Sequence, residues 1–277
     1  MLSRQYCHFA NQAMPNALFH RYRIFAACCL ALLSGFASAD DVKDLEEELA
    51  LTIEDATPGQ PGSIELNGGL RYQRLRASEA NSGRNEYQLT PRLQIGVARN
   101  FQVAIAAPYR LGNAPDTSRG ELRLDALLRL NDEGRYLPAF AVDVGLERPY
   151  GAGDAGTEIL VKGIATKSLG VAKERDRPAQ LHVNLVARRN LNPGEDERRN
   201  RYLFGAALSK KLSERWLVAG SLFREEQRER GSAFNIAEAG ARWKLSEKTI
   251  LSGSVGAGLN REAPLWRLLL GFQRSLD

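Results

Sequence analysis

Residues 86–97 read EYQLTPRLQIGV, a stretch in which polar and apolar side chains alternate along its whole length. Its apolar set is Tyr87, Leu89, Pro91, Leu93, Ile95 and Val97. A period of two residues places this set on one face of an extended chain and the polar side chains on the other. The stretch therefore predicts a β-strand with one apolar face and one polar face.

The same pattern recurs downstream, and Gly, Pro, Asn, Asp or Ser ends each run. We expect strands at residues 63–75, 85–97, 101–110, 120–130, 137–147, 157–167, 180–189, 201–210, 216–224, 233–245, 249–259 and 265–273. Short connections alternate with longer ones, except that residues 168–179 are long where a short turn is expected. In lipid, a closed sheet leaves no unpaired backbone edge. The pattern predicts an all-β fold, an antiparallel transmembrane barrel of about 12 strands; the alternative, a soluble β-sandwich, also predicts alternation.

The N-terminal residues 1–39 have the features of a secretion signal. Two arginines precede an apolar run at residues 24–33, and the small residues 37–39 suit cleavage after Ala39. The sequence leaves open whether Met1 or Met14 is the start. All three cysteines lie in this segment, so the expected mature chain excludes thiol catalysis and cysteine-based zinc binding.

An acidic arm and linker are expected at residues 40–62, between the signal and a barrel at residues 63–277. Residues 40–55 contain eight acidic residues and one lysine. Residues 41–54 carry apolar side chains at helical spacing, which predicts a short amphipathic helix, and the Pro and Gly of residues 57–62 predict a linker. Whether the arm enters the barrel as a plug or remains a periplasmic tail stays open.

If the apolar face meets lipid, the polar face lines the lumen, and two groups of lumenal residues become candidate sites. Hairpin pairing, whose register could slip by two residues, places the candidate constriction at about one height together with Ala106. The constriction residues are Arg92, Asp125, Asp143, Lys162 and Asn184. The candidate outer-mouth group is Arg110, Glu121, Arg123, Glu158 and Arg188. Charged rings discriminate solutes in pores, whereas the plainer interpretation is that these side chains solvate and stiffen the lumen.

The lumen is also expected to be narrow and partly apolar. Bulky side chains share the inward face of the strands: Leu127, Leu160, Ile164, Leu203 and Leu217. Twelve strands enclose less space than the 16 to 18 of open porins. A narrow, partly apolar bore favours small aromatic solutes, and a slight cationic surplus favours carboxylated ones.

Enzymatic and cofactor-dependent functions find little support. His182 is the single histidine of the expected mature chain and faces inward, and no serine lies at a spacing that implies a catalytic pair. An outer-membrane hydrolase therefore lacks a visible nucleophile. We expect no catalytic residue, no cofactor, no metal site and no nucleic-acid partner, because the metal-ligand and nucleotide-binding spacings are absent.

The turn and strand at residues 96–101 and 106–110, GVARNF and AAPYR, resemble a family of outer-membrane proteins named as transporters linked to the meta-pathway of phenol degradation. The following strand with Asp125 and a later glycine-rich loop are similar too, and the resemblance covers roughly residues 60–273. It implies a small barrel for uptake of hydrophobic or aromatic compounds. The chain departs from many barrels at its end, where residues 273–277 follow Phe272 in place of a terminal aromatic residue.

These observations predict a passive channel for small, aromatic or carboxylated solutes in the outer membrane of a Gram-negative bacterium. Its expected partners are outer-membrane lipids, lipopolysaccharide, the barrel insertion machinery and a small-molecule solute. The alternative is a non-transporting structural or surface-binding barrel, whose arginine-rich loops at residues 195–201 and 224–230 would bind lipopolysaccharide phosphates or a partner.

Overall fold

The computed structural model describes residue 45 and residues 51–76, 83–115, 117–151, 156–170 and 178–276. The chain divides into a unit of residues 1–38, outside the described residues, and a unit of residues 39–277. The expected signal and most of the expected helix at residues 41–54 also lie outside the described residues. Residues 51–53 form a bend and Leu45 lies in a turn, so no helix is found in the described part of this segment.

The second unit is built from strands. They are β1 (Ile64–Arg74), β2 (Asn85–Ala98), β3 (Phe101–Ala106), β4 (Tyr109–Gly112), β5 (Arg119–Arg129), β6 (Ala139–Gly151), β7 (Glu158–Leu169), β8 (Ala179–Asn190), β9 (Asn200–Ser213), β10 (Trp216–Glu226), β11 (Ala233–Ser246), β12 (Thr249–Gly258) and β13 (Trp266–Ser275). Every expected strand is present, with ends that move by a few residues.

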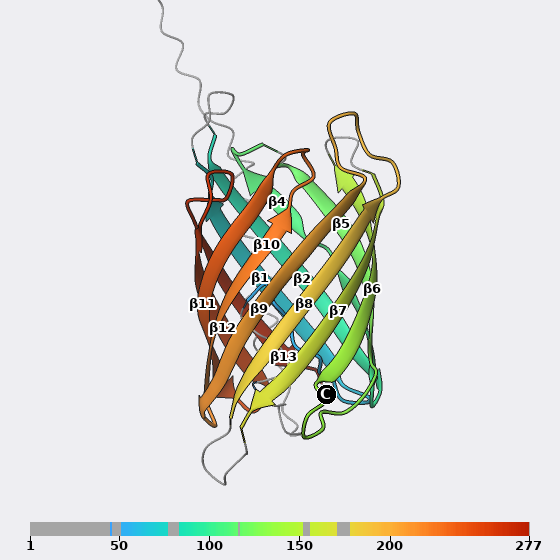
Figure 1. The fold of residues 1–277 in the computed structure, drawn as a ribbon, viewed down its shortest axis with the longest axis vertical. Helices are drawn as coiled ribbons and strands as arrows, with labels where there is room; N and C mark the ends of the chain where they lie inside the picture. The colour runs from blue at the N-terminus through green and yellow to red at the C-terminus, as the bar shows by residue number, and fades with distance from the viewer. Residues whose placement is uncertain are drawn as a thin grey trace, which may run out of the picture. The chain divides into compact units, whose positions relative to one another are not determined.

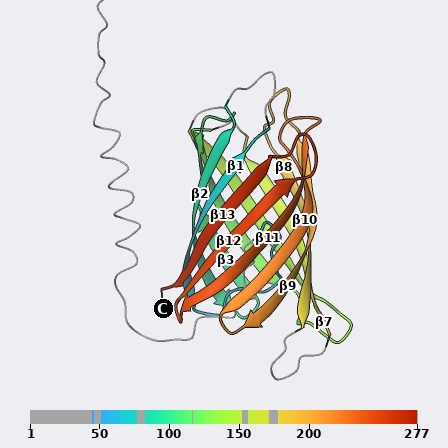
Figure 2. The ribbon, with the colours of Figure 1, turned by 90° about the vertical axis from the view of Figure 1, so that its left-hand side faces the viewer.

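The strands form one closed antiparallel barrel (Figures 1 and 2). Each strand pairs with the next along the chain, except that β3 and β4 pair with β2 and β5 and not with each other. β1 pairs with both β13 and β2, which closes the sheet. The expected strand at residues 101–110 is split into β3 and β4 because Pro108 has no N–H to give to a ladder. Both pieces lie between β2 and β5, so the thirteen segments make a wall of twelve strands. The expected fold class is confirmed.

The two faces of the wall have the reverse of the polarity of a water-soluble fold. Apolar side chains face outward and are exposed, such as Val97 at 53% and Leu185 at 56%. Charged and amide side chains face inward and are buried, such as Gln94 at 4% and Glu65 at 1%. A soluble sandwich would bury the apolar set, so this polarity excludes the sandwich alternative and matches a barrel whose outer face meets lipid.

The two ends of the barrel differ. We call one the turn end, because the connections at residues 99–100, 214–215 and 247–248 are tight there. At the turn end, longer intervals of the chain separate β5 from β6 (residues 130–138) and β7 from β8 (residues 170–178), so the expected exception at the sixth connection is confirmed. We call the other the loop end. The intervals of the chain between strands that meet there are residues 75–84, 113–118, 152–157, 191–199, 227–232 and 259–265, of which the structure describes the last three in full.

Aromatic side chains gather close to both ends of the wall. Tyr72 packs against Tyr87 and against Trp266, with ring centroids 4.9 Å apart in each pair. At the turn end, Trp216 stacks on Trp243 with centroids 5.8 Å apart. Rings at two levels match the girdles that barrels place at the two membrane interfaces. Among the described residues, no helix is long and apolar enough to cross a membrane.

An arginine introduced in the middle of the outer face tests whether this face contacts lipid. We expect Leu185→Arg, in the centre of β8, to destabilise folding into lipid vesicles by about 2–4 kcal/mol, because the charge would enter the hydrocarbon. Leu137→Arg, in the turn-end connection at residues 130–138, is the control and should cost about 0–1 kcal/mol. Urea titration of vesicle-folded protein measures both, and equal effects would contradict the assignment.

Candidate functional site: the barrel interior

A tight turn directs the chain preceding β1 into the barrel. The Ser63 N–H donates to the Gln60 carbonyl at 3.1 Å, with Pro61 and Gly62 between them and a φ of 83° at Gly62. Pro followed by Gly with positive φ is the pattern of a type II turn. Gly96 on β2 allows this close approach, because a Cβ there would lie 1.9 Å from the Gln60 carbonyl oxygen. The expected linker is thus a defined reversal, and residues 51–60, which we call the lumenal segment, lie inside the wall.

Side chains of four separate strands bind the backbone of the lumenal segment. The N–H groups of residues 52, 54, 56 and 59 donate to Glu238 Oε2 (3.0 Å), Asn184 Oδ1 (2.9 Å), Thr166 Oγ1 (3.1 Å) and Gln102 Oε1 (2.6 Å). Asn184 also donates from Nδ2 to the Glu54 carbonyl at 2.8 Å. The segment therefore crosses the lumen from β11 past β8 and β7 to β3.

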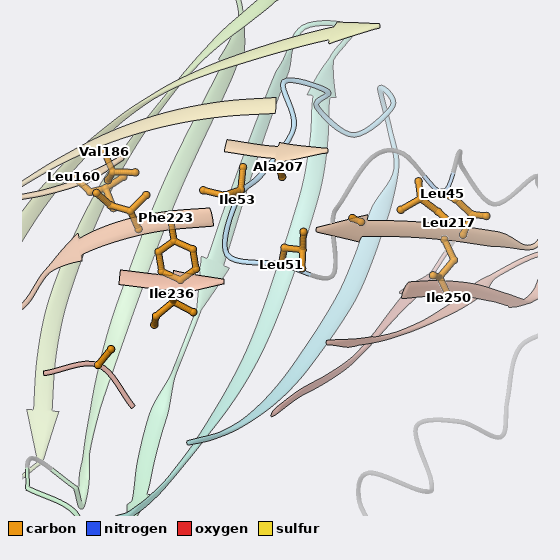
Figure 3. Close-up of a cluster of buried hydrophobic side chains, with 13 residues drawn as sticks. Leu45, Leu51, Ile53, Leu160, Val186, Ala207, Leu217, Phe223, Ile236 and Ile250 are labelled. Atoms are coloured by element: carbon orange, nitrogen blue, oxygen red, sulfur yellow. The ribbon is translucent and has the colours of Figure 1, made fainter. Parts of the chain in front are cut away.

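Apolar contacts add to these hydrogen bonds. Leu45, Leu51 and Ile53 join one buried cluster with side chains of the wall, which Figure 3 shows as sticks. The wall residues of this cluster are Leu160, Val186, Leu203, Ala207, Leu217, Ala219, Phe223, Ile236 and Ile250, together with Ala263 of the loop end. Ala56 packs in a second cluster with Leu127, Ala139, Ala141 and Ile164. The five bulky residues expected to narrow the bore thus pack around the segment.

One acidic residue of the segment lies against the expected constriction group. Lys162 Nζ donates to Glu54 Oε2 at 2.7 Å and also lies 3.1 Å from Asp143 Oδ2. Desolvation inside the barrel would raise the pKa of Glu54, but the nearby cations Lys162, Arg92 and Arg123 lower it to about 2. The ammonium group of Lys162 therefore joins a wall carboxylate to a carboxylate of the segment.

The expected constriction is assembled only in part. Arg92 pairs with Ala106, and Asp143 with Lys162, as the hairpin pairing predicted. The other pairings shift by two residues: Asp125 lies opposite Ala104 and Gly145, and Asn184 lies opposite Ile164. Asp125 receives a hydrogen bond of 2.6 Å from Arg123 Nε, and Asn184 holds the segment. The five residues therefore do not form one simple ring.

The outer-mouth group lies at the loop end and is tied together by ion pairs. Arg110 contacts Glu121 at 3.4 Å, and Arg188 Nη1 lies 2.8 Å from both carboxylate oxygens of Glu147. Arg123 also reaches Glu147, at 3.6 Å. Glu158 pairs with Arg201 of β9. All five residues predicted for this group make such pairs, counting the bond between Arg123 and Asp125.

His182 has a serine neighbour that the sequence spacing did not reveal. Its Nε2 lies 2.9 Å from Ser209 Oγ, and its Nδ1 lies 3.1 Å from Thr166 Oγ1. Spacing along the sequence could not indicate this neighbour, because β8 and β9 bring distant residues side by side. Thr166 in turn accepts the N–H of Ala56, so the imidazole belongs to the network that holds the segment. Within the described ranges, no group of three or more His, Cys, Asp or Glu side chains could hold a metal ion.

Three further interior residues were missing from the sequence prediction. Glu147 pairs with Arg188, Glu238 binds the N–H and hydroxyl of Thr52, and Arg242 Nη1 donates to the Leu45 carbonyl at 2.8 Å. Alternation could have found them, since each has the same parity as an inward neighbour on its strand. Their partners could not be found in this way.

Comparison with known proteins supports the fold. No protein-family model and no curated protein matches this chain. Solved structures do match. Among them are an outer membrane channel from Pseudomonas putida F1 (TM-score 0.58, 15% identity, 80% of this chain and 98% of that one), the KdgM porin in complex with disordered oligogalacturonate (TM-score 0.52, 9% identity, 78% and 99%) and the NanC porin (TM-score 0.52, 9% identity, 77% and 100%). The chain therefore has the barrel fold of outer-membrane channels, while the finer resemblance to phenol-degradation transporters is not confirmed.

Charge reversal at Glu54 tests how the segment is held. In Glu54→Lys the new cation would face Lys162, so we expect the segment to lose on the order of 1–2 kcal/mol of binding to the wall, allowing for partial exposure to water. A nitroxide on Thr57→Cys, in a mature chain otherwise free of cysteine, should become more mobile in its EPR spectrum. Glu214→Lys, an exposed charge reversal at the turn end, is the control and should leave the spectrum unchanged.

The same label tests the pH dependence. A carboxylate whose pKa falls from 4.5 to about 2 stabilises docking above pH 4.5, and this contribution is lost as the pH falls from 4.5 toward 2. We expect constant label mobility between about pH 5 and 8 and a rise below about pH 4.5. In Glu54→Gln this acid-induced step should be smaller; a step of equal size would assign it to another group.

Proposed function

We propose that this protein is a channel of the bacterial outer membrane for passive movement of small solutes, with the lumenal segment controlling the width of the bore. The proposal includes cleavage of the secretion signal near Ala39 and division into an arm with its linker at residues 40–62 and a barrel at residues 63–277. In this orientation the turn end faces the periplasm and the loop end faces outward.

The observation that carries the proposal is space for water beside the segment. The side chain of Glu54 is 41% exposed although it lies inside the barrel, while its partner Lys162 is 6% exposed. Arg123 and Arg188 on the inner wall are each 22% exposed. A bore filled by packed side chains would leave these charged groups no contact with water, so the interior supports a narrow, wet path past the segment.

The partly exposed arginines beside this path favour a solute with a carboxylate. The narrow bore favours a small solute, for which we propose an aromatic or otherwise apolar part. The sequence resemblance to phenol-degradation transporters supports the same choice. Outer-membrane lipids, lipopolysaccharide and the insertion machinery are the partners that a barrel of this class would have.

A second candidate is a non-transporting barrel with a structural or surface-binding role. The ion pairs of the loop end and the segment bound inside the wall favour it, because both obstruct the bore. Arginines exposed on the loops at residues 191–199 and 227–232 could then bind lipopolysaccharide phosphates.

Single-channel recording in planar bilayers separates the two candidates. The mature protein is compared with a variant lacking residues 40–56, which keeps the turn at residues 60–63. We expect steady current from the mature protein and a larger current from the shortened variant, because the bore then holds only residues 57–60 of the lumenal segment. Glu54→Lys should move the current in the same direction, and Glu214→Lys should not.

Silence from both proteins, each shown to be folded by its electrophoretic shift on heating, would contradict the channel. That outcome would favour the second candidate, which is tested by binding of lipopolysaccharide vesicles. Equal currents from both proteins would leave a channel but contradict control by the segment.

A further inference from the structure

One arginine at the loop end reaches from its loop to the far side of the barrel. Arg228 lies in the β10–β11 loop, residues 227–232, and contacts Glu121 of β5 (Nη2 to Oε1, 3.3 Å) and Glu158 of β7 (Nε to Oε1, 3.2 Å). In the order of the sheet, β6, β7, β8 and β9 separate β5 from β10. The side chain therefore crosses the mouth of the bore, and strand alternation could not assign it there because it belongs to a loop.

Backbone hydrogen bonds fix the position of this loop. The Arg198 N–H of the β8–β9 loop donates to the Arg228 carbonyl at 2.7 Å, and the Arg230 N–H donates to the Asp196 carbonyl at 3.1 Å. The two loops thus pair with each other as short extended strands do. Arg228 is presented by this paired structure, which limits the conformational entropy that a ligand would have to remove.

One nitrogen of the Arg228 guanidinium group lacks a partner in the described part of the chain. Arg228 lies in a row of alternating ion pairs, Arg110, Glu121, Arg228, Glu158 and Arg201. The Arg228 side chain is 10% exposed, and its Nη1 has no hydrogen-bond partner among the described residues. A buried donor without a partner is unfavourable, so Arg228 is suited to a further acceptor.

We infer that Arg228, with Arg110 and Arg201, forms a binding site for the carboxylate of a small organic acid at the outer mouth. The planar fork of arginine matches a carboxylate with two parallel hydrogen bonds, and the two protein partners of Arg228 are themselves carboxylates. Because Nη1 is buried, a solute carboxylate would first replace Glu121 or Glu158 on the guanidinium group and would then bring an acceptor to Nη1. The inference rests on the proposed function for the placement of this site on a solute path.

Binding of benzoate to the whole mature protein tests the site without requiring conduction. Saturation-transfer NMR in detergent should show benzoate bound, and benzamide, which has the same shape without the charge, bound much more weakly. Arg228→Gln should weaken benzoate binding at least about tenfold, because a hydrogen-bonded charge is lost. The benzoate affinity of Arg228→Lys should lie between those of the unaltered protein and Arg228→Gln, because lysine keeps the positive charge but lacks the planar pair of N–H donors.

Arg230→Gln is the matched control. Arg230 lies in the same loop, is exposed, and binds the Glu197 carbonyl through Nε, so its loss changes the net charge equally while leaving the cluster intact. Benzoate binding should match that of the unaltered protein. If Arg230→Gln and Arg228→Gln lose benzoate affinity equally, the loss reflects only the change in net charge, and the inference is overturned. Benzamide binding as strong as benzoate binding would also overturn it.

Two further measurements complete the test. Adding chloride at constant ionic strength should not displace benzoate. Full displacement would show that the site binds anions in general and is not specific for a carboxylate. In planar bilayers, benzoate added on the loop side should reduce the current through the unaltered channel and not through Arg228→Gln. If the protein binds benzoate but carries no current, the proposed function is contradicted and this inference is not. If the protein carries a current that benzoate does not change, and no benzoate binding is found, this inference is contradicted and the proposed function is not.

Discussion

Everything in this molecule depends on closure of the sheet between β1 and β13. A peptide group facing hydrocarbon has no water to bond, and an open sheet edge would leave a row of such groups unpaired. The ladder between residues 65–74 and 266–275 removes that edge. Closure also divides the side chains into two sets with different solvents: the outward set meets lipid and the inward set encloses a lumen.

The interior follows from this division. Because the ladders already use the backbone groups of the wall, the lumenal segment cannot add to the sheet as another strand. Its N–H groups need acceptors from side chains, and Glu238, Asn184 and Thr166 provide them at alternate residues of the segment. The segment is thus held by a few directional bonds and two apolar clusters, an arrangement that fixes its path and still leaves Glu54 partly in water.

Two obstacles therefore lie in series along the proposed path. At the loop end, Arg228 crosses the mouth between carboxylates of β5 and β7; deeper in the bore, the segment passes Lys162 and Asp143. In the proposed channel the first obstacle would select by charge, because its contacts are ion pairs. The second would select by size, because the segment occupies part of the bore. A small acid suits both.

The sequence by itself determined the strands, their inward and outward faces and the closed all-β class, because a period of two residues is local and needs no knowledge of neighbours. It also placed the ten candidate lumenal residues on the inner wall. The tertiary structure alone decided the pairing of Asp125 and Asn184, each shifted by two residues, since such a slip keeps every side chain on its face. The tertiary structure alone also placed Ser209 beside His182, the lumenal segment inside the barrel and Arg228 across the mouth. These contacts join residues far apart in the chain, which the closed wall brings together.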